Sequence, residues 1–300
     1  MKLFDAHCHL QLPQFDADRE KVIARMREKE TGGIIVGTDL ETSKAGLEIA
    51  KQHDFLWASV GLHPNDNLKE EFDEKAFEKL AQHPKVRAIG ECGLDYFRSG
   101  GTLEEQSSQK ARLEKQIELA VKVGKALIIH CRNAHDDMLA MIAEKKPNVP
   151  VVIHFCTVSG ELAQKYLNLG CYLSFPGPIT YTDMYDDSIK IAPLDKILVE
   201  TDSPFAAPVP FRGALENDLE ALKARLLREE LSRADEPALN PILRRAANEA
   251  ASLAWFTPFP LLVFPLLLEE KAEAARQQEA RQRQIRRRSR AGVASLRLTA

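Results

Sequence analysis

The chain has 300 residues, of which 44% are hydrophobic and 28% are charged, with a formal net charge of −3. This composition supports a sizeable buried core and excludes a chain that is disordered throughout. No apolar run reaches the about 20 residues of a membrane span, and polar residues at positions 5–9 interrupt what would be the apolar part of a secretory signal. Five cysteines without a CxxC pair are typical of a reduced protein, so we expect a cytoplasmic location.

Short apolar runs alternate with longer amphipathic stretches over residues 1–213. The runs predict buried strands at 2–8, 33–38, 55–62, 86–93, 126–131, 151–156, 171–175 and 196–202. The stretches between them predict helices, among them 19–30, 43–53, 74–82, 109–123 and 161–169. This alternation predicts an α/β fold, a (β/α)8 TIM-like barrel. A doubly wound open sheet is the alternative, but no glycine-rich phosphate fingerprint follows the first strand.

The composition changes near residue 213. Residues 1–213 carry 18 Lys and 8 Arg, whereas residues 214–300 carry 2 Lys and 13 Arg. We therefore expect a barrel at 1–213, closed by a helix at 215–232, and an atypical extension at 233–300 that is partly helical or disordered. Two other interpretations stay open. The end is an added module whose basic stretch 281–290 binds nucleic acid or an anionic surface, or the reading frame changes near residue 213.

Histidines and carboxylates gather where the predicted strands end. Because the carboxyl ends of parallel strands meet on one face of a barrel, we expect these side chains to converge. In the HxH pair, alternate residues of a strand point to the same side. The group consists of His7, His9, His63, Glu91, His130, His154 and Asp202.

These residue types predict a metal centre. Imidazoles with carboxylates suit Zn, Mn, Fe or Ni, and carboxylate pairs also admit Mg. A carboxylate such as Glu91 can bridge two cations about 3.5–4 Å apart, which stabilise the attacking and leaving oxygens of a phosphoryl transfer. Cys8, Cys92, Cys131 and Cys156 adjoin the predicted ligands, but a neighbour on a strand points the opposite way, so we expect packed thiols and not metal ligands.

Five motifs give the chain a family likeness: DAHCHL (5–10), VGLHP (60–64), GECGLDY (90–96), IIHCRNAHDDML (128–139) and ETDSPFAAPVPFRG (200–213). Over residues 2–213 the chain resembles the TatD family of metal-dependent deoxyribonucleases, within the amidohydrolase-like superfamily. The resemblance implies a hydrolase with two divalent cations (Mg, Mn or Zn) that cleaves phosphodiester bonds by a metal-activated water. It implies a 3′–5′ exonuclease acting on DNA, with RNA as an open alternative.

The resemblance also implies residue roles. His7, His9 and Asp202 would hold the first cation, Glu91 would bridge, and His130 and His154 would hold the second. Asp202 is also the expected proton acceptor, and His63 would contact the scissile phosphate or stabilise the leaving oxygen.

Less specific roles follow for four other positions. Asp95 and Arg132 would position metal-site groups or bind substrate, or else form a structural salt bridge. Gln109 and Gln116 are expected to be packing or capping residues. Val158 stands where the family usually has a glycine, and the sequence after residue 213 departs from the family pattern. Both departures bear on substrate preference and on how the chain ends.

Two other functions stay open. The same metal site serves a deacylase of aminoacyl-tRNA or a related amide or ester hydrolase, and a non-enzymatic scaffold would bind metal without turnover. We expect no membrane span and no obligate protein partner, and a monomer or weak oligomer.

Overall fold

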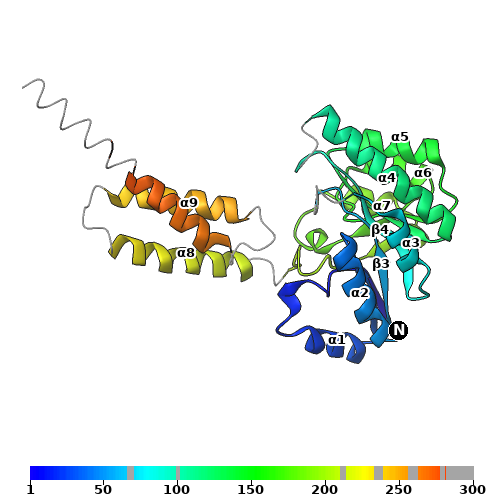
Figure 1. Cartoon of the computed structure of the whole chain (residues 1–300), viewed down its shortest axis with the longest axis horizontal. Coiled ribbons are helices and arrows are strands. Elements are labelled where there is room, and N and C mark those ends of the chain that lie inside the picture. The colour runs from blue at the N-terminus through cyan, green and yellow to red at the C-terminus, as the bar shows by residue number, and fades with distance from the viewer. Residues whose placement is uncertain are drawn as a thin grey trace, which may run out of the picture. The chain divides into compact units, whose positions relative to one another are not determined.

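The computed structural model describes residues 1–65, 71–98, 102–209, 214–232, 239–255, 263–277 and 281. The chain forms two compact units, Met1–Pro210 and Phe211–Ala300 (Figure 1). Each unit has a hydrophobic core of its own. The boundary therefore falls close to residue 213, where the composition changes.

Eight parallel strands form the first unit, and they follow chain order in a single sheet (Figure 1). They are β1 (Leu3–Cys8), β2 (Thr31–Val36), β3 (Leu56–Val60), β4 (Val86–Asp95), β5 (Ala126–Arg132), β6 (Val151–Ile153), β7 (Tyr172–Phe175) and β8 (Ile197–Val199). Residues just after β8 return to β1, where the amide of Asp202 donates to the carbonyl of His7 and the amide of His9 donates to the carbonyl of Ser203. The predicted (β/α)8 barrel is confirmed.

Helices connect the strands of the barrel. They are α1 (Arg19–Glu28), α2 (Leu40–Gln52), α3 (Glu74–Ala81), α4 (Leu103–Val123), α5 (His135–Lys145), α6 (Gly160–Asn168) and α7 (Asp186–Ile191). Side-chain caps begin several of them; for example, the side chain of Thr102 accepts from the amide of Glu105. This capping box starts α4 at Leu103, six residues before the helix predicted from apolar spacing. Helices α5 and α7 lie between predicted strands, in intervals for which the sequence analysis gave no helix bounds.

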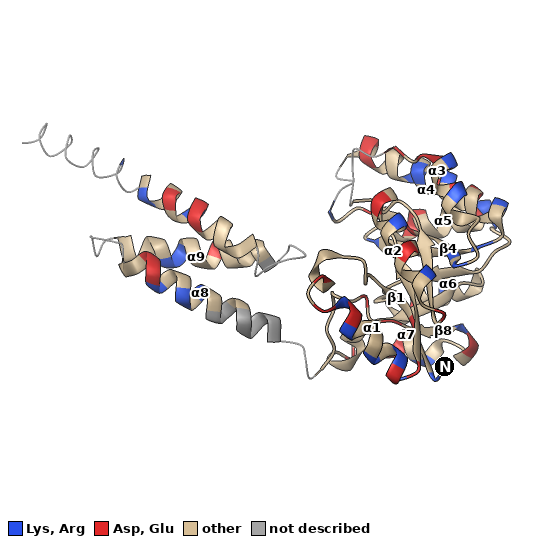
Figure 2. Cartoon of the chain, turned by 60° about the horizontal axis from the view of Figure 1, so that its bottom comes forward, with Lys and Arg blue, Asp and Glu red and all other residues tan. Residues whose placement is uncertain are grey.

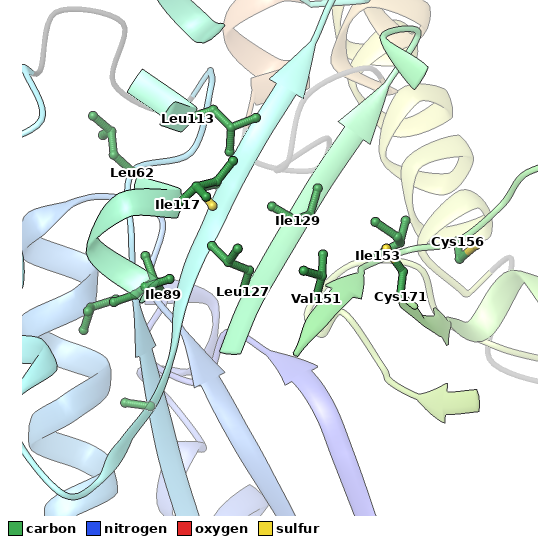
Figure 3. Packing of buried hydrophobic residues seen from close by; sticks show 14 of the residues in the cluster. Leu62, Ile89, Leu113, Ile117, Leu127, Ile129, Val151, Ile153, Cys156 and Cys171 are labelled. Carbon is green, nitrogen blue, oxygen red and sulfur yellow. The ribbon is translucent and has the colours of Figure 1, made fainter. Parts of the chain in front are cut away.

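The strands place alternate side chains on two faces of the sheet. On β5, Leu127 and Ile129 belong to the large core cluster, together with Leu113 and Ile117 of α4 (Figure 3). Ile128 belongs to a separate small cluster with residues of β2 and β4, inside the barrel. His130 lies two residues after Ile128, so the same alternation directs its side chain inward at the end of the strand.

The second unit is helical. It contains α8 (Ala214–Ser232), α9 (Asn240–Trp255) and a further helix at 263–277. Acidic and basic residues both occur along the described parts of these helices (Figure 2). Its core joins small and large apolar residues: Leu219, Ala247, Ala250, Ala251, Ala254, Phe264 and Leu268. The helix predicted at 215–232 is therefore present, and its role in closing the barrel stays a prediction.

Several expectations about the end of the chain lie outside the described residues. The basic stretch 281–290 is described only at Arg281, and residues 210–213, where the composition changes, are not described. Among the residues that are described, no helix is long and apolar enough to cross a membrane.

Candidate metal centre

The predicted ligands converge at the carboxyl ends of the strands. Their side-chain nitrogen and oxygen atoms form three overlapping groups, and within each group the atoms lie within 4.8 Å of one another. The groups are His7, His154 and Asp202; His7, His9 and Glu91; and His63, Glu91 and His130. Three of the predicted metal ligands, His9, His154 and Asp202, lie slightly beyond their strands, because β1 ends at Cys8, β6 at Ile153 and β8 at Val199.

Glu91 lies at the centre of these groups. Its Oε2 is 3.3 Å from Nε2 of His7 and 4.0 Å from Nε2 of His9. Its Oε1 faces the other side, 2.9 Å from Nδ1 of His130, 3.4 Å from Nε2 of His63 and 3.6 Å from Nε2 of His154. The two oxygens of one carboxylate thus face different sets of histidines.

Asp202 completes the side of the cluster that His7 and His9 occupy. Its Oδ1 is 3.3 Å from Nε2 of His9 and 3.6 Å from Nε2 of His7. His154 lies between the two sides, with its Nε2 4.0 Å from the same oxygen and its ring stacked on that of His7 at a centroid distance of 3.6 Å. This dense set of nitrogen and oxygen donors suits divalent transition metals.

Close approach of two strands positions Glu91. Gly93 of β4 has a φ of 152°, and a Cβ at this residue would lie 1.8 Å from the carbonyl oxygen of His130 on β5. Gly90 is similar, because its Cβ would lie 2.4 Å from the carbonyl oxygen of Ile128. Only glycine permits this approach, which brings Glu91 on β4 next to His130 on β5.

Three of the histidines have a partner on the ring nitrogen that faces away from the cluster. Nδ1 of His9 lies 2.9 Å from the carbonyl oxygen of Val36. Nδ1 of His154 lies 2.9 Å from Oε1 of Glu200, and Nε2 of His130 lies 3.1 Å from Oδ2 of Asp95. An acceptor at one nitrogen places the proton there, so the other nitrogen offers its lone pair to a cation.

His63 has the opposite arrangement. Its Nδ1 accepts a hydrogen bond from the amide of Asn65 at 3.1 Å. In the neutral ring the proton therefore lies on Nε2, the nitrogen that faces Glu91. His63 is close enough to be grouped with the metal ligands, but its tautomer makes it a proton donor at the cluster.

Glu200 is a residue of the site that the sequence analysis missed. It is buried, and its Oε1 also accepts from the amide of Phe155, whereas its Oε2 accepts from the hydroxyl of Ser174. A signal was present, since Glu200 stands two residues before Asp202 in the ETDSP motif. Its partner His154, however, is distant in sequence, and only the fold brings the two together.

Charges within the cluster set the pKa values of its members. Burial alone would favour the neutral form of Glu91, but the imidazoles of His154, His63 and His130 hold its pKa well below its usual range. Burial likewise opposes protonation of His154, yet Glu200, Glu91 and Asp202 raise its pKa to about 10. The carboxylates are therefore ionised, and they hold a positive charge on His154 when no cation is bound.

Asp95 and Arg132 have different positions at the site. Asp95 is buried, and its Oδ1 accepts from the amides of Phe97 and Arg98 while Oδ2 faces His130. Although burial alone raises its pKa, the hydrogen bonds from His130 and the two amides lower it to about 2. Arg132 lies at the exposed end of β5, with its Cζ 3.8 Å from the centroid of the Phe97 ring. Asp95 thus orients His130, and its expected contact with substrate stays a prediction.

Gln109 and Gln116 of α4 do more than pack or cap. The side-chain amide of Gln109 accepts from the amide of Asp95 at 2.8 Å and donates to the Asp95 carbonyl at 3.1 Å. Gln116 makes the same pair of bonds with Leu62, at 2.8 and 3.0 Å. Helix α4 therefore fixes the backbone at Asp95 and directly before His63.

The cysteines and Val158 were also singled out by the sequence. Among the described residues, none of the candidate metal-binding groups contains a cysteine. Cys8, Cys92 and Cys156 belong to the hydrophobic core, where burial raises their pKa values. Val158 is also buried and lines a cavity beside His154.

Comparisons with known proteins agree with this geometry. The model of the family described as TatD related DNase matches residues 4–244. An uncharacterized metal-dependent hydrolase, YabD of Bacillus subtilis (strain 168), is 38% identical over 216 residues, which cover 70% of this chain and 84% of that protein. A protein named 3′-5′ ssDNA/RNA exonuclease TatD, of Enterobacter lignolyticus (strain SCF1), is 32% identical over 225 residues, covering 72% and 85%.

A solved structure shares the fold. The crystal structure of YJJV, a TatD homolog from Escherichia coli K12, aligns with a TM-score of 0.64 at 28% identity and covers 70% of this chain and 83% of that one. The family match also continues past residue 213, where the motif resemblance ends, and reaches into α9. The chain therefore belongs to the TatD-related DNase family of metal-dependent hydrolases.

Proposed function

We propose that this protein hydrolyses phosphodiester bonds of DNA from the 3′ end of a strand, with RNA as a further substrate. The proposal rests on the position of Glu91, because its two carboxylate oxygens face different sets of histidines. Such a carboxylate suits a pair of cations, and a pair of cations suits phosphoryl transfer. The name of the Enterobacter relative supports a nucleic acid substrate.

The donor set fits two divalent cations of the Mn, Zn or Mg type. His7, His9 and Asp202 would hold one with Oε2 of Glu91, and His130 and His154 would hold the other with Oε1. When bound, the cations supply Lewis acidity at the phosphoryl group and promote ionisation of a water molecule.

The chain's own residues supply the remaining steps. Asp202 accepts a proton from the attacking water, because its carboxylate is ionised: burial alone raises its pKa, but the hydrogen bond with His9 and the charges of the neighbouring histidines lower it. His63 carries its proton on Nε2 and donates a hydrogen bond from it to the leaving oxygen, which stabilises the charge that develops there. Arg132 at the rim neutralises phosphate charge.

The test is degradation of a 5′-labelled single-stranded DNA by the full chain, with and without added Mn²⁺. We expect a ladder of products that shorten from the 3′ end, only with the cation. Glu91→Ala should lower the rate at least about 1,000-fold, since one side chain contacts both cation positions. Glu20→Ala, at an exposed position of α1, is the matched control and should keep the full rate.

Two results would contradict the proposal. The first is a folded, metal-loaded protein that leaves DNA and RNA intact but deacylates D-aminoacyl-tRNA, which would establish the ester hydrolase. The second is DNA cleavage that survives in Glu91→Ala.

A further inference from the structure

A small cavity adjoins the candidate metal centre. Its volume is about 200 Å³, and it lies at the ends of β5 and β6 with His154 as one wall. Pockets that hold whole ligands of drug size have volumes of roughly 300–1,000 Å³. This cavity therefore fits a single group of a larger substrate whose reacting bond lies at the cluster.

The charge beside the cavity comes from Arg132, one of its lining residues. Among the described residues, no carboxylate forms an ion pair with Arg132, whereas Arg19 and Arg27 pair with Asp16 and Asp54. Stacking on Phe97 holds the guanidinium in place. A guanidinium that is held in position without an anionic partner suits an anionic group of a ligand.

Further polar groups face the cavity from α5 and from the segment after β6. His135 lines it, and its Nδ1 is 2.9 Å from the hydroxyl of Tyr166, which is fully buried and fixes the ring. Thr157 lines the opposite segment, and within the described chain its hydroxyl makes no hydrogen bond to protein. Neither residue belongs to the groups that could hold a metal ion.

The backbone around the cavity is itself unusual. Asn133 and Phe155 both line it, and their φ angles of 54° and 48° lie in the left-handed region. This conformation is unfavourable for residues with side chains, and it occurs preferentially at functional sites. It places the residues that follow β5 and β6 around one small space.

We propose that this cavity binds a second phosphate of the substrate strand, next along the chain to the phosphodiester that is cleaved. Arg132 supplies the charge, and His135 and Thr157 supply hydrogen bonds. The inference rests on the proposed phosphodiesterase function and adds a subsite that selects substrates with more than one phosphate.

The experiment compares three dinucleotides that differ only in phosphate groups: TpT, pTpT and TpTp. With Mn²⁺ and the full chain, we expect kcat/KM for one of the two phosphorylated dinucleotides to exceed that for TpT by about tenfold, mainly through KM. The double variant His135→Phe, Thr157→Val keeps a planar ring at one position and the branched shape of threonine at the other, and it removes the hydrogen-bonding atoms of both side chains. Its ratio of kcat/KM values should fall towards one, and this ratio does not depend on the fraction of folded enzyme.

His53→Gln is the matched control, since His53 lies at the end of α2 and lines neither the cavity nor the cluster. It should keep the wild-type ratio. Equal kcat/KM for the three dinucleotides, or a ratio unchanged in the double variant, would overturn the subsite and leave the phosphodiesterase intact. Failure to cleave any dinucleotide or a longer DNA strand would overturn both.

Discussion

The barrel and the helical unit bury different kinds of side chain. Within the described parts of the chain, every buried polar or charged side chain lies in Met1–Pro210, and most of the charged ones surround Glu91. Among the residues that the structure describes there, the core of the helical unit consists of alanine, leucine and phenylalanine. Burying a charged group is unfavourable unless it has a partner, so the barrel carries polar groups that serve a site, whereas the helical unit is held together by apolar contacts.

The largest expected effect is a loss of stability that is confined to the helical unit. Phe264 is fully buried in the helical core, and Phe264→Ala should destabilise that unit by about 3–5 kcal/mol. Hydrogen exchange measured along the whole chain should show faster exchange in α8 and α9 and unchanged protection in the strands. Leu266→Ala on the same helix is the control, because Leu266 is 68% exposed and should shift stability by less than about 0.5 kcal/mol. Equal loss of protection in the strands would show that the two cores are not independent.

The next largest effect is a loss of metal affinity at the barrel. In Asp95→Asn, the amide nitrogen can face Nε2 of His130 as a donor, which moves the ring proton to Nδ1, the nitrogen that faces Glu91. A protonated Nδ1 cannot bind a cation, so Mn²⁺ affinity at the weaker site should fall about 10–100-fold in calorimetric titrations.

Asp137→Asn is the matched control for this change. Asp137 lies on α5, outside the candidate metal-binding groups, where it accepts a hydrogen bond from the hydroxyl of Tyr96 and forms an ion pair with Lys110 of α4. It should leave Mn²⁺ affinity unchanged. Equal Mn²⁺ affinity in Asp95→Asn and Asp137→Asn would show that Asp95 does not orient His130.

The smallest effect is a dependence of metal affinity on pH. Cation binding requires a neutral imidazole, and the carboxylates around His154 raise its pKa to about 10. The proton must leave when the cation binds, so affinity should rise by about tenfold per pH unit below this pKa for one released proton. Calorimetry in buffers of different ionisation enthalpy counts that proton. Glu200→Gln should make the dependence less steep, and a pH-independent affinity in the wild type would contradict the assignment.

The strands and the convergence of ligands could be predicted because both follow from local patterns. Apolar runs predicted β1 to β8, and the position of each histidine or carboxylate at a strand end placed it on one face. The helix at 215–232 followed from the spacing of its leucines in the same way. These features depend on neighbours a few residues apart.

The groups that orient the ligands could not be predicted in the same way. The contact of Glu200 with His154, and that of Gln116 with the backbone before His63, join residues on different elements. They depend on the register between strands and on the rotation of α4. The tautomer of His63 likewise depends on the turn that presents the amide of Asn65.

The most direct test of a cation pair bridged by Glu91 is the number of cations that the full chain binds. Mn²⁺ should be counted by equilibrium dialysis and elemental analysis for the wild type and for Glu91→Gln, which keeps the shape of the side chain and removes its charge. We predict two Mn²⁺ per chain in the wild type and at most one in the variant. One cation or none in the folded wild type, or two cations held with equal affinity in Glu91→Gln, would contradict the bridging role of Glu91.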